Sequence, residues 1–350
     1  MENRLSTAGG MSHNLHLLRF IAAVLVIMSH SFVLSNGSFE KEWFYKVSGG
    51  QITMGAFAVG VFFLYSGFLI MRSLDKKPKC KEFIVGRCVR IFPVLICVVF
   101  ITFVFIGPVM TNISVKQYFS DIGAYKYLLN SIFVLVHGLP GVFENNIYTS
   151  TVNGALWTLP VEFLCYIICY IGFRIGILQK KWAYLTIPVI GIGTFGTFVV
   201  ANKLQSEMLL TVLFPILCFY VGVMYAIYRQ FVKLDFRLFL LSLVIFVLCG
   251  FWGILKVGFI IGFTYSLIYI AFGARSVKNI IWKSGNWSYA MYLIGFPIQQ
   301  VIIDIYGGDM NPYINIVIAL PIIVVCSIIL YEMIEKRSTQ YYKKRKENKV

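Results

Sequence analysis

Long apolar runs alternate with short polar segments along almost the whole chain. Ten runs are long enough to cross a bilayer as α-helices, because about 20 residues span its hydrocarbon core. They lie at residues 15–35, 54–72, 91–110, 154–175, 183–201, 208–228, 236–255, 257–274, 288–306 and 313–334. This pattern predicts an all-α, polytopic membrane protein.

One further apolar run, YLLNSIFVLV at 127–136, is too short to span a membrane. We expect it to be re-entrant or to lie at the outer interface. It falls within a predicted outer loop at 111–153, which is long enough to shape a pocket.

Composition and charge agree with this architecture. The 350 residues are 59% hydrophobic and 13% charged, whereas soluble proteins carry roughly a quarter charged residues. The net charge of +16 does not indicate nucleic-acid binding, because basic residues gather in alternate loops and no nucleic-acid-binding motif is seen. With a cytoplasmic N-terminus, the outer loops hold six of the 31 Lys and Arg: Lys41, Lys46, Lys116, Lys126, Lys203 and Lys256. The positive-inside rule then predicts that both termini are cytoplasmic.

The same pattern predicts a single membrane domain over residues 1–350. Its core covers about 13–335, and 336–350 forms a basic cytoplasmic tail. We expect this tail to be disordered and close to anionic lipid headgroups. Six of the eight cysteines lie in apolar runs, where Cys packs as a small hydrophobe. Cys165 and Cys169 lack further ligands at zinc-binding spacing, so we predict no metal site.

The first apolar run carries an arginine at one end and a histidine at the other, in RFIAAVLVIMSH. Arg19 and His30 are about three helical turns apart, so they share one face and are separated by roughly 16 Å. Ionisable groups inside a membrane are candidates for function. The alternatives are that Arg19 reaches to the inner interface and that His30 makes a buried structural hydrogen bond.

A partner for His30 occurs in LWTLPVEFLCY. Glu162 lies at a similar predicted depth, so it can pair with the imidazole and stabilise its protonated form during general-base catalysis. A structural ion pair and a transporter's proton relay are the alternatives. Pro160 is expected to disturb the helix and free backbone groups for a pocket.

Two more stretches carry candidate chemistry. In GRCVRIFP, Arg87 and Arg90 share a helix face and suit bidentate binding of phosphate, although plain positive-inside charge also explains them. In FFLYSGFLI, the Ser66-Gly67 pair allows close approach of a neighbouring helix or a kink.

Taken together, the chain resembles the acyltransferase-3 family, membrane enzymes that O-acylate sugars of bacterial envelope glycans. The resemblance covers essentially the whole chain and rests on LRFIAAVLVIMSH, FFLYSGFLI, GRCVRIFP, LWTLPVEFLCY and GNWSYAMYLIGFP, in that order. One departure is Gly295, where many members have His, so no role is carried over to that position.

The resemblance implies an O-acetyltransferase of the bacterial inner membrane, with no tightly bound cofactor. Acetyl-CoA, or another acyl-CoA, would enter from the cytoplasm. The acceptor would be a hydroxyl of an envelope saccharide such as O-antigen, capsule, exopolysaccharide or a lipid-linked precursor. His30, paired with Glu162, would act as general base or carry the acyl group, and Arg19, Arg87 and Arg90 would bind the donor. The motifs add supporting pocket residues, which are Ser66, Trp157, Tyr289 and Tyr292.

Two rival functions fit part of the pattern. A proton-coupled transporter or flippase would use His30 and Glu162 as a relay and the arginines to bind anionic substrate. A polysaccharide polymerase also uses many helices, but we expect its large outer loop to be rich in Arg, and 111–153 contains none. The sugar, the hydroxyl position and the choice between acetyl, succinyl and longer acyl groups stay open.

Overall fold

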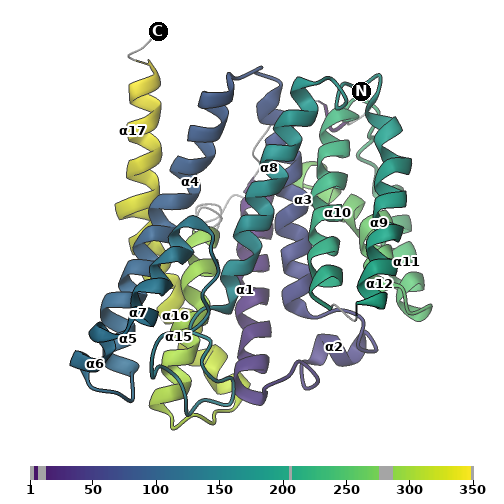
Figure 1. Ribbon diagram of the computed structural model, residues 1–350. Coiled ribbons are helices and arrows are strands. Elements are labelled where there is room, and N and C mark those ends of the chain that lie inside the picture. The colour runs from purple at the N-terminus through teal and green to yellow at the C-terminus, as the bar shows by residue number, and fades with distance from the viewer. Residues whose placement is uncertain (1–3, 7–12, 205–206, 276–286, 348–350) are drawn as a thin grey trace. The chain divides into compact units, whose positions relative to one another are not determined.

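The computed structural model describes residues 4–6, 13–204, 207–275 and 287–347. These residues are mostly helical, with two isolated antiparallel bridges, Arg4 to Lys233 and Thr111 to Val142 (Figure 1). The predicted all-α class is therefore confirmed.

Among the residues that the structure describes, seven helices are long and apolar enough to cross a membrane. They cover Asn14–Asn36, Met54–Leu74, Cys80–Met110, Gly154–Arg174, Met208–Ile227, Leu255–Phe272 and Pro312–Arg345. Two shorter apolar helices, Ala183–Thr197 and Phe236–Phe251, accompany them. The tenth predicted run forms the helix Ser288–Ile305, which falls outside the seven. The chain is thus a multi-pass membrane protein, while the count of ten spans and the side of each terminus remain predictions.

The chain divides into two compact units, each built from three separate stretches. Unit 1 contains residues 1–22, 47–77 and 158–285, and unit 2 contains 23–46, 78–157 and 286–350. The first long helix, α1 (His13–Asn36), contributes its start to unit 1 and its remainder to unit 2.

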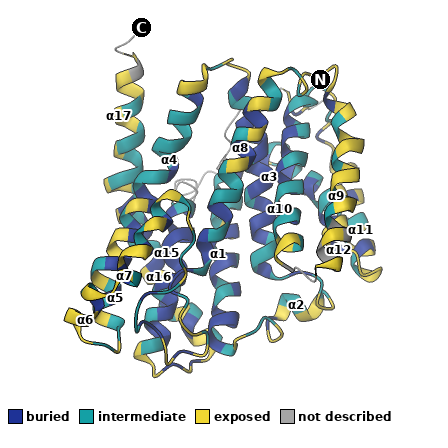
Figure 2. Ribbon diagram, in the orientation of Figure 1, coloured by how far each residue is buried: buried dark blue, intermediate teal, exposed yellow. Residues whose placement is uncertain are grey.

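Unit 1 is built around the buried helix α3 (Met54–Leu74), which is largely dark blue in Figure 2. The side chain of Thr53 caps its start by accepting a hydrogen bond from the backbone N–H of Ala56. The other helices of this unit are α8 (Thr158–Arg174), α9 (Thr186–Lys203), α10 (Glu207–Ile227), α11 (Phe236–Phe251), α12 (Leu255–Gly258) and α13 (Thr264–Phe272).

Two glycines let α3 and α10 touch through their backbones. A Cβ atom on Gly67 would lie 2.0 Å from the carbonyl oxygen of Phe219, and one on Gly222 would lie 2.0 Å from that of Leu64. No larger side chain fits at such distances, so small residues set this contact. The close approach predicted for the Ser66-Gly67 pair is confirmed.

Unit 2 contains the rest of α1 and the hairpin of α15 (Ser288–Ile305) and α16 (Pro312–Leu330). Helix α4 (Cys80–Ile101) continues through a π-helical turn at Thr102–Ile106 into α5 (Gly107–Met110). Short helices complete the unit, namely α2 (Trp43–Val47) up to Lys46, and α6 (Val115–Ser120) and α7 (Ile122–Lys126) of the 111–153 segment.

The structure corrects three local expectations. The tail is helical rather than disordered as far as it is described, because α17 (Lys336–Glu347) continues from α16 through a π-helical turn and packs on α4. The packing on α4 explains this, and Tyr342 donates a hydrogen bond to the carbonyl oxygen of Glu82 (3.2 Å) within it. Helix α4 begins at Cys80 rather than 91. Pro160 lies in the first turn of α8, where a missing N–H costs little, so it does not interrupt the helix.

The short apolar run at 127–136 does not form a spanning helix. Its first part is a 3₁₀ helix, Tyr127–Ile132, which ends at Phe133 in the left-handed conformation with φ of 68°. Asn130 holds the turn through its side chain, which donates to the carbonyl oxygen of Val136 and accepts from its N–H. The expectation that this run is too short to span is confirmed.

Candidate active site

In unit 1, Glu162 is the centre of a cluster of three polar side chains. The hydroxyls of Ser66 and Tyr166 both donate hydrogen bonds to its carboxylate oxygen Oε1. The two hydroxyl oxygens lie 2.8 Å from each other. A carboxylate inside an apolar helix bundle is costly without such donors, so the two hydroxyls stabilise its position.

Three helices build this cluster. Glu162 and Tyr166 are four residues apart on α8 and therefore share a face. Ser66 lies on α3, directly before Gly67, where α10 approaches closely. From α10, the ring of Phe219 lies 6.0 Å from that of Tyr166. The packing of α3, α8 and α10 thus determines which groups reach Glu162.

His30 lies in unit 2, on the part of α1 after residue 22. Its ring meets the ring of Phe296 edge-on, with centroids 5.1 Å apart and planes at 73°. Among the residues that the structure describes, none is seen to hydrogen-bond the imidazole. An imidazole with its nitrogens available can exchange protons with a substrate.

Buried amides hold the helical turn that carries His30. The Nε2 group of Gln299 donates to the carbonyl oxygen of Ile27 (2.8 Å) and contacts the Ser31 hydroxyl (2.5 Å). The Ser31 hydroxyl also lies 2.9 Å from Oδ1 of Asn315. Since Gln299 and Asn315 belong to α15 and α16, this hairpin fixes the turn of α1 on which His30 lies.

A buried carboxylate, Glu42, adjoins the same turn. Ser29, directly before His30, donates a hydrogen bond of 2.6 Å to Oε2 of Glu42, whose exposed fraction is 0%. Glu42 lies just before α2, so this bond ties the segment after α1 back to that helix.

The predicted donor-binding arginines are divided between the units. Arg87 and Arg90 lie on α4 in unit 2, where both are half-buried and the guanidinium of Arg87 lies 5.6 Å from the Phe83 ring centroid. Arg19 lies on α1 in unit 1. The grouping of Arg19 with the other two therefore stays a prediction, as does the pairing of His30 in unit 2 with Glu162 in unit 1.

The tyrosines of the predicted pocket hydrogen-bond to backbone. Tyr289 donates to the carbonyl oxygen of Ile91, directly after Arg90, and Tyr292 donates to that of Ala155, each at 2.9 Å. Ala155 belongs to the 3₁₀ helix Gly154–Trp157, so Tyr292 ties α15 to the segment that ends at Trp157. These tyrosines position neighbouring elements within unit 2.

Sequence reasoning missed Tyr166, Phe296 and Gln299. Tyr166 stands four residues after Glu162, which is a usable signal for a shared helix face. Gln299 and Gln300 are a polar pair in an apolar helix and could have been singled out on that ground. Phe296 carries no signal of its own, because aromatic residues make up 17% of this chain.

The chemistry of these groups suits proton transfer. An available imidazole can take a proton from a hydroxyl, and a fixed carboxylate can stabilise an imidazolium. No group of three or more His, Cys, Asp or Glu able to hold a metal occurs in the described part of the chain.

Comparison with known proteins gives the family. The sequence pattern of the acyltransferase-3 family, described as an acyltransferase domain, matches residues 12–332. An O-acetyl transferase of Shigella phage Sf6 is 26% identical over 330 residues, covering 91% of this chain and 93% of that protein. Nodulation protein 10 of Rhizobium leguminosarum bv. viciae is 26% identical over 201 residues, covering 56% of this chain and 52% of that protein.

No solved structure matches the chain. The family match covers both compact units and includes every residue assigned above to the candidate site. It favours acyl transfer over the transporter and polymerase alternatives. The chain belongs to the acyltransferase-3 family and is a multi-pass membrane acyltransferase.

Proposed function

We propose that this protein is an O-acetyltransferase that moves an acetyl group from cytoplasmic acetyl-CoA to a hydroxyl of an envelope saccharide, in a bacterial inner membrane. The similarity to the phage O-acetyl transferase carries this proposal, because it extends over nearly the full length of both chains. The site supports the proposal as well, because the imidazole of His30 is suited to activating a hydroxyl.

In the proposed reaction, His30 removes the proton of the acceptor hydroxyl as its oxygen attacks the thioester carbonyl carbon. The new C–O ester bond forms, the C–S bond breaks, and the imidazolium returns the proton to the departing CoA thiolate. Alternatively, a His30 nitrogen attacks the thioester carbon, the C–S bond breaks and CoA leaves as its thiol. The acceptor hydroxyl then attacks the acetyl-imidazole, the C–O bond forms as the C–N bond breaks, and the hydroxyl proton goes to the freed imidazole.

In this proposal Glu162 stabilises the imidazolium. Ser66 and Tyr166 both donate to its Oε1. No hydrogen bond to the other oxygen, Oε2, is seen among the described residues, so Oε2 remains available for an imidazole N–H. The pairing rests on the similar predicted depths of the two residues in the membrane.

The test is acetyl transfer by purified protein at saturating acetyl-CoA. His30→Ala should lower turnover by about 10²–10⁴-fold, the usual loss for a general base, while CoA binding is kept. His137→Ala, which removes an exposed histidine of unit 2, is the matched control and should keep normal turnover. Near-normal turnover of His30→Ala would refute this role.

A second measurement separates the two forms of the mechanism. Radiolabelled acetyl-CoA is mixed with protein without acceptor, and the mixture is quenched. Label that stays on the wild type but not on His30→Ala indicates an acyl carrier, whereas unlabelled wild type with full turnover indicates a general base.

The acceptor is tested in cells. Mass spectrometry of envelope glycans from strains with and without the gene should show loss of one acetyl group from a saccharide. A different lost mass would identify succinyl or a longer acyl group, and unchanged glycans would refute a saccharide acceptor.

A further inference from the structure

An arginine that the proposed mechanism does not use lies near the end of α3. Arg72 is half-buried, and its NH1 group is shielded from solvent without a hydrogen-bond partner among the described residues. Its guanidinium carbon lies 5.8 Å from the ring centroid of Phe68, which is fully buried. Phe68 in turn contacts Phe272 of α13, with centroids 5.1 Å apart. One side of the guanidinium therefore faces an apolar wall.

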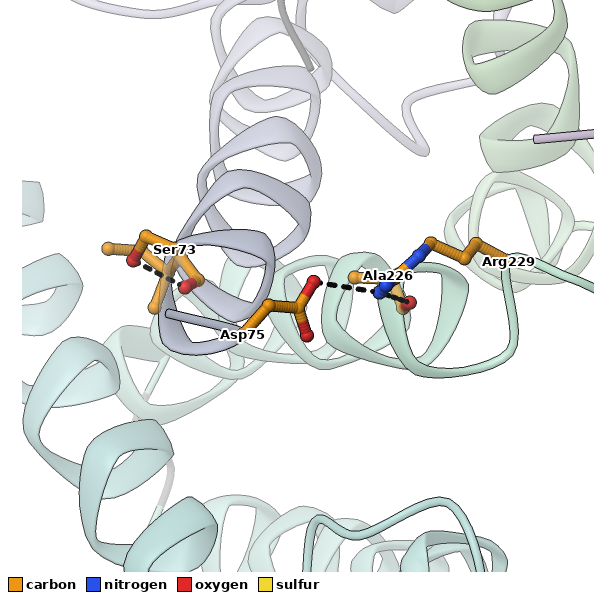
Figure 3. A network of polar contacts seen from close by, with 5 residues as sticks. Ser73, Asp75, Ala226 and Arg229 are labelled. Carbon is orange, nitrogen blue, oxygen red and sulfur yellow. Dashed lines mark hydrogen bonds and ion pairs between the residues drawn. The ribbon is translucent and has the colours of Figure 1, made fainter. Parts of the chain in front are cut away.

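The acidic residue nearest to Arg72 along the chain is already paired. Asp75 Oδ2 lies 3.0 Å from NH1 of Arg229, just beyond the end of α10. That same NH1 group also donates to the carbonyl oxygen of Ala226 at 3.0 Å. Figure 3 shows Asp75 directed towards Arg229 in this network. The ion pair is thus complete without Arg72.

A permanently charged guanidinium with a shielded and unpaired N–H group is costly unless an anion accepts from it. Its planar fork matches the oxygens of a phosphate. Arg72 lies at the end of α3 that the positive-inside rule places in the cytoplasm, where an acyl-CoA donor would arrive.

We propose that Arg72 binds a phosphate group of the acyl donor. This inference rests on the proposed function. CoA carries a diphosphate and a separate ribose 3′-phosphate, so it offers Arg72 two kinds of phosphate group. A lipid headgroup is the other source of a phosphate at this depth, and the experiment must distinguish the two.

The experiment measures binding of CoA itself to purified protein in nanodiscs of neutral lipid, so no acceptor is needed. Arg72→Gln should weaken CoA binding by about tenfold or more, the usual effect of losing a charge-assisted hydrogen bond. Arg72→Lys should recover part of the affinity as a point charge. Arg174→Gln, which removes an exposed arginine of the same unit, is the matched control and should bind CoA normally.

Truncated probes identify the phosphate. Arg72→Gln should have no effect on pantetheine, which lacks phosphate. If Arg72 holds the 3′-phosphate, dephospho-CoA should bind wild type and variant equally. If it holds the diphosphate, the variant should lose affinity for dephospho-CoA as well. Unchanged CoA affinity, or an equal loss in Arg174→Gln, would overturn the proposal.

A second experiment varies the lipid composition of the nanodiscs. If anionic nanodiscs stabilise the wild type more than Arg72→Gln while both bind CoA equally, the phosphate belongs to lipid and the donor assignment is wrong. Failure of the proposed function is distinguishable, because it would appear as wild-type protein that neither binds CoA nor transfers acetyl groups.

Discussion

The carboxylate of Glu162 receives hydrogen bonds from Ser66 and Tyr166 on the same oxygen, Oε1. Both donors fix the rotation of the carboxylate. The protein, rather than the substrate, therefore determines the direction in which Oε2 points. Removing either donor should therefore make the orientation of the Glu162 carboxylate less fixed, while the carboxylate itself is kept.

Tyr166→Phe tests this directly. The variant removes one hydrogen bond to a charged group, usually worth about 1.5–3 kcal/mol, so we expect turnover to fall roughly tenfold or more. Tyr225→Phe is a suitable control, because the Tyr225 hydroxyl has only a 3.5 Å contact with Thr264. Equal turnover of both variants would show that the Tyr166 hydroxyl does not orient Glu162.

Donor binding is tested at Arg87 and Arg90. Arg90→Ala or Arg87→Ala should weaken acyl-CoA binding by roughly 10–100-fold, because each removes a charge-assisted contact. Lys81→Ala removes an exposed cation from the first turn of the same helix and should change binding little. The measurement is calorimetry with CoA. If both variants bind CoA with wild-type affinity, Arg87 and Arg90 reflect only the orientation of the chain and do not bind the donor.

Which site residues the sequence could predict depends on whether a contact is local. Ser66 and Glu162 were each predicted as functional, but they are 96 positions apart in the chain, so their contact needed the packing of α3 on α8. Tyr166 is local to Glu162 and was predictable in principle. The contact of His30 with Phe296 again joins distant segments, in this case α1 and α15.

Among the elements, the α3–α10 contact depends on glycine. At Gly67 and Gly222 an added methyl group would collide with backbone carbonyls, which cannot rotate away. We therefore expect Gly222→Ala to lower the free energy of unfolding by about 1–3 kcal/mol or more. Gly191→Ala on α9 is the control, since nothing lies within 4 Å of its Cβ position. Thermal unfolding in detergent should show a lower Tm only for Gly222→Ala, and equal Tm values would contradict this close packing.

The hairpin of α15 and α16 holds α1 through buried amides. Gln299→Ala removes the donor to Ile27 and Ser31 and should destabilise the protein by about 1–3 kcal/mol. Ser327→Ala should cost less, because the Ser327 hydroxyl bonds only within its own helix, to the carbonyl oxygen of Ile323. The comparison is made by thermal unfolding. A smaller loss for Gln299→Ala than for Ser327→Ala would refute the holding role.

Helix positions were predictable to within a few residues in the apolar runs, because hydropathy measures burial in lipid directly. The helix ends that adjoin basic loops were not predictable from hydropathy. Helix α4 extends back to Cys80 and α17 extends to Glu347, through residues that read as polar loop and tail. Contact between these two helices supplies the missing stabilisation, through bonds such as that of Tyr342 to Glu82. Such tertiary contacts do not appear in a hydropathy pattern.

Helix α1 contributes residues to both compact units. Arg19 lies in its part of unit 1 and His30 in its part of unit 2, along one continuous helix. A donor-binding group at one end and a hydroxyl-activating group towards the other would place acyl donor and acceptor on opposite sides of the membrane. That arrangement depends on the orientation of the chain, which the distribution of Lys and Arg predicts.

Cysteine labelling tests the orientation. Cys80 is exposed and lies in a predicted cytoplasmic segment, whereas Glu144 is exposed and lies in the predicted outer loop. Asn146 lies in the same loop but is only 1% exposed, so a cysteine at this position would not react with the reagent and could not report the topology. An impermeant maleimide added to intact cells should label Glu144→Cys in a Cys80→Ser background but leave wild-type Cys80 unlabelled. After the membrane is permeabilised, both should react, which shows that each thiol is accessible. The reverse order of labelling would place the N-terminus outside, and acyl-CoA could then not reach Arg19, Arg87 and Arg90 from the cytoplasm.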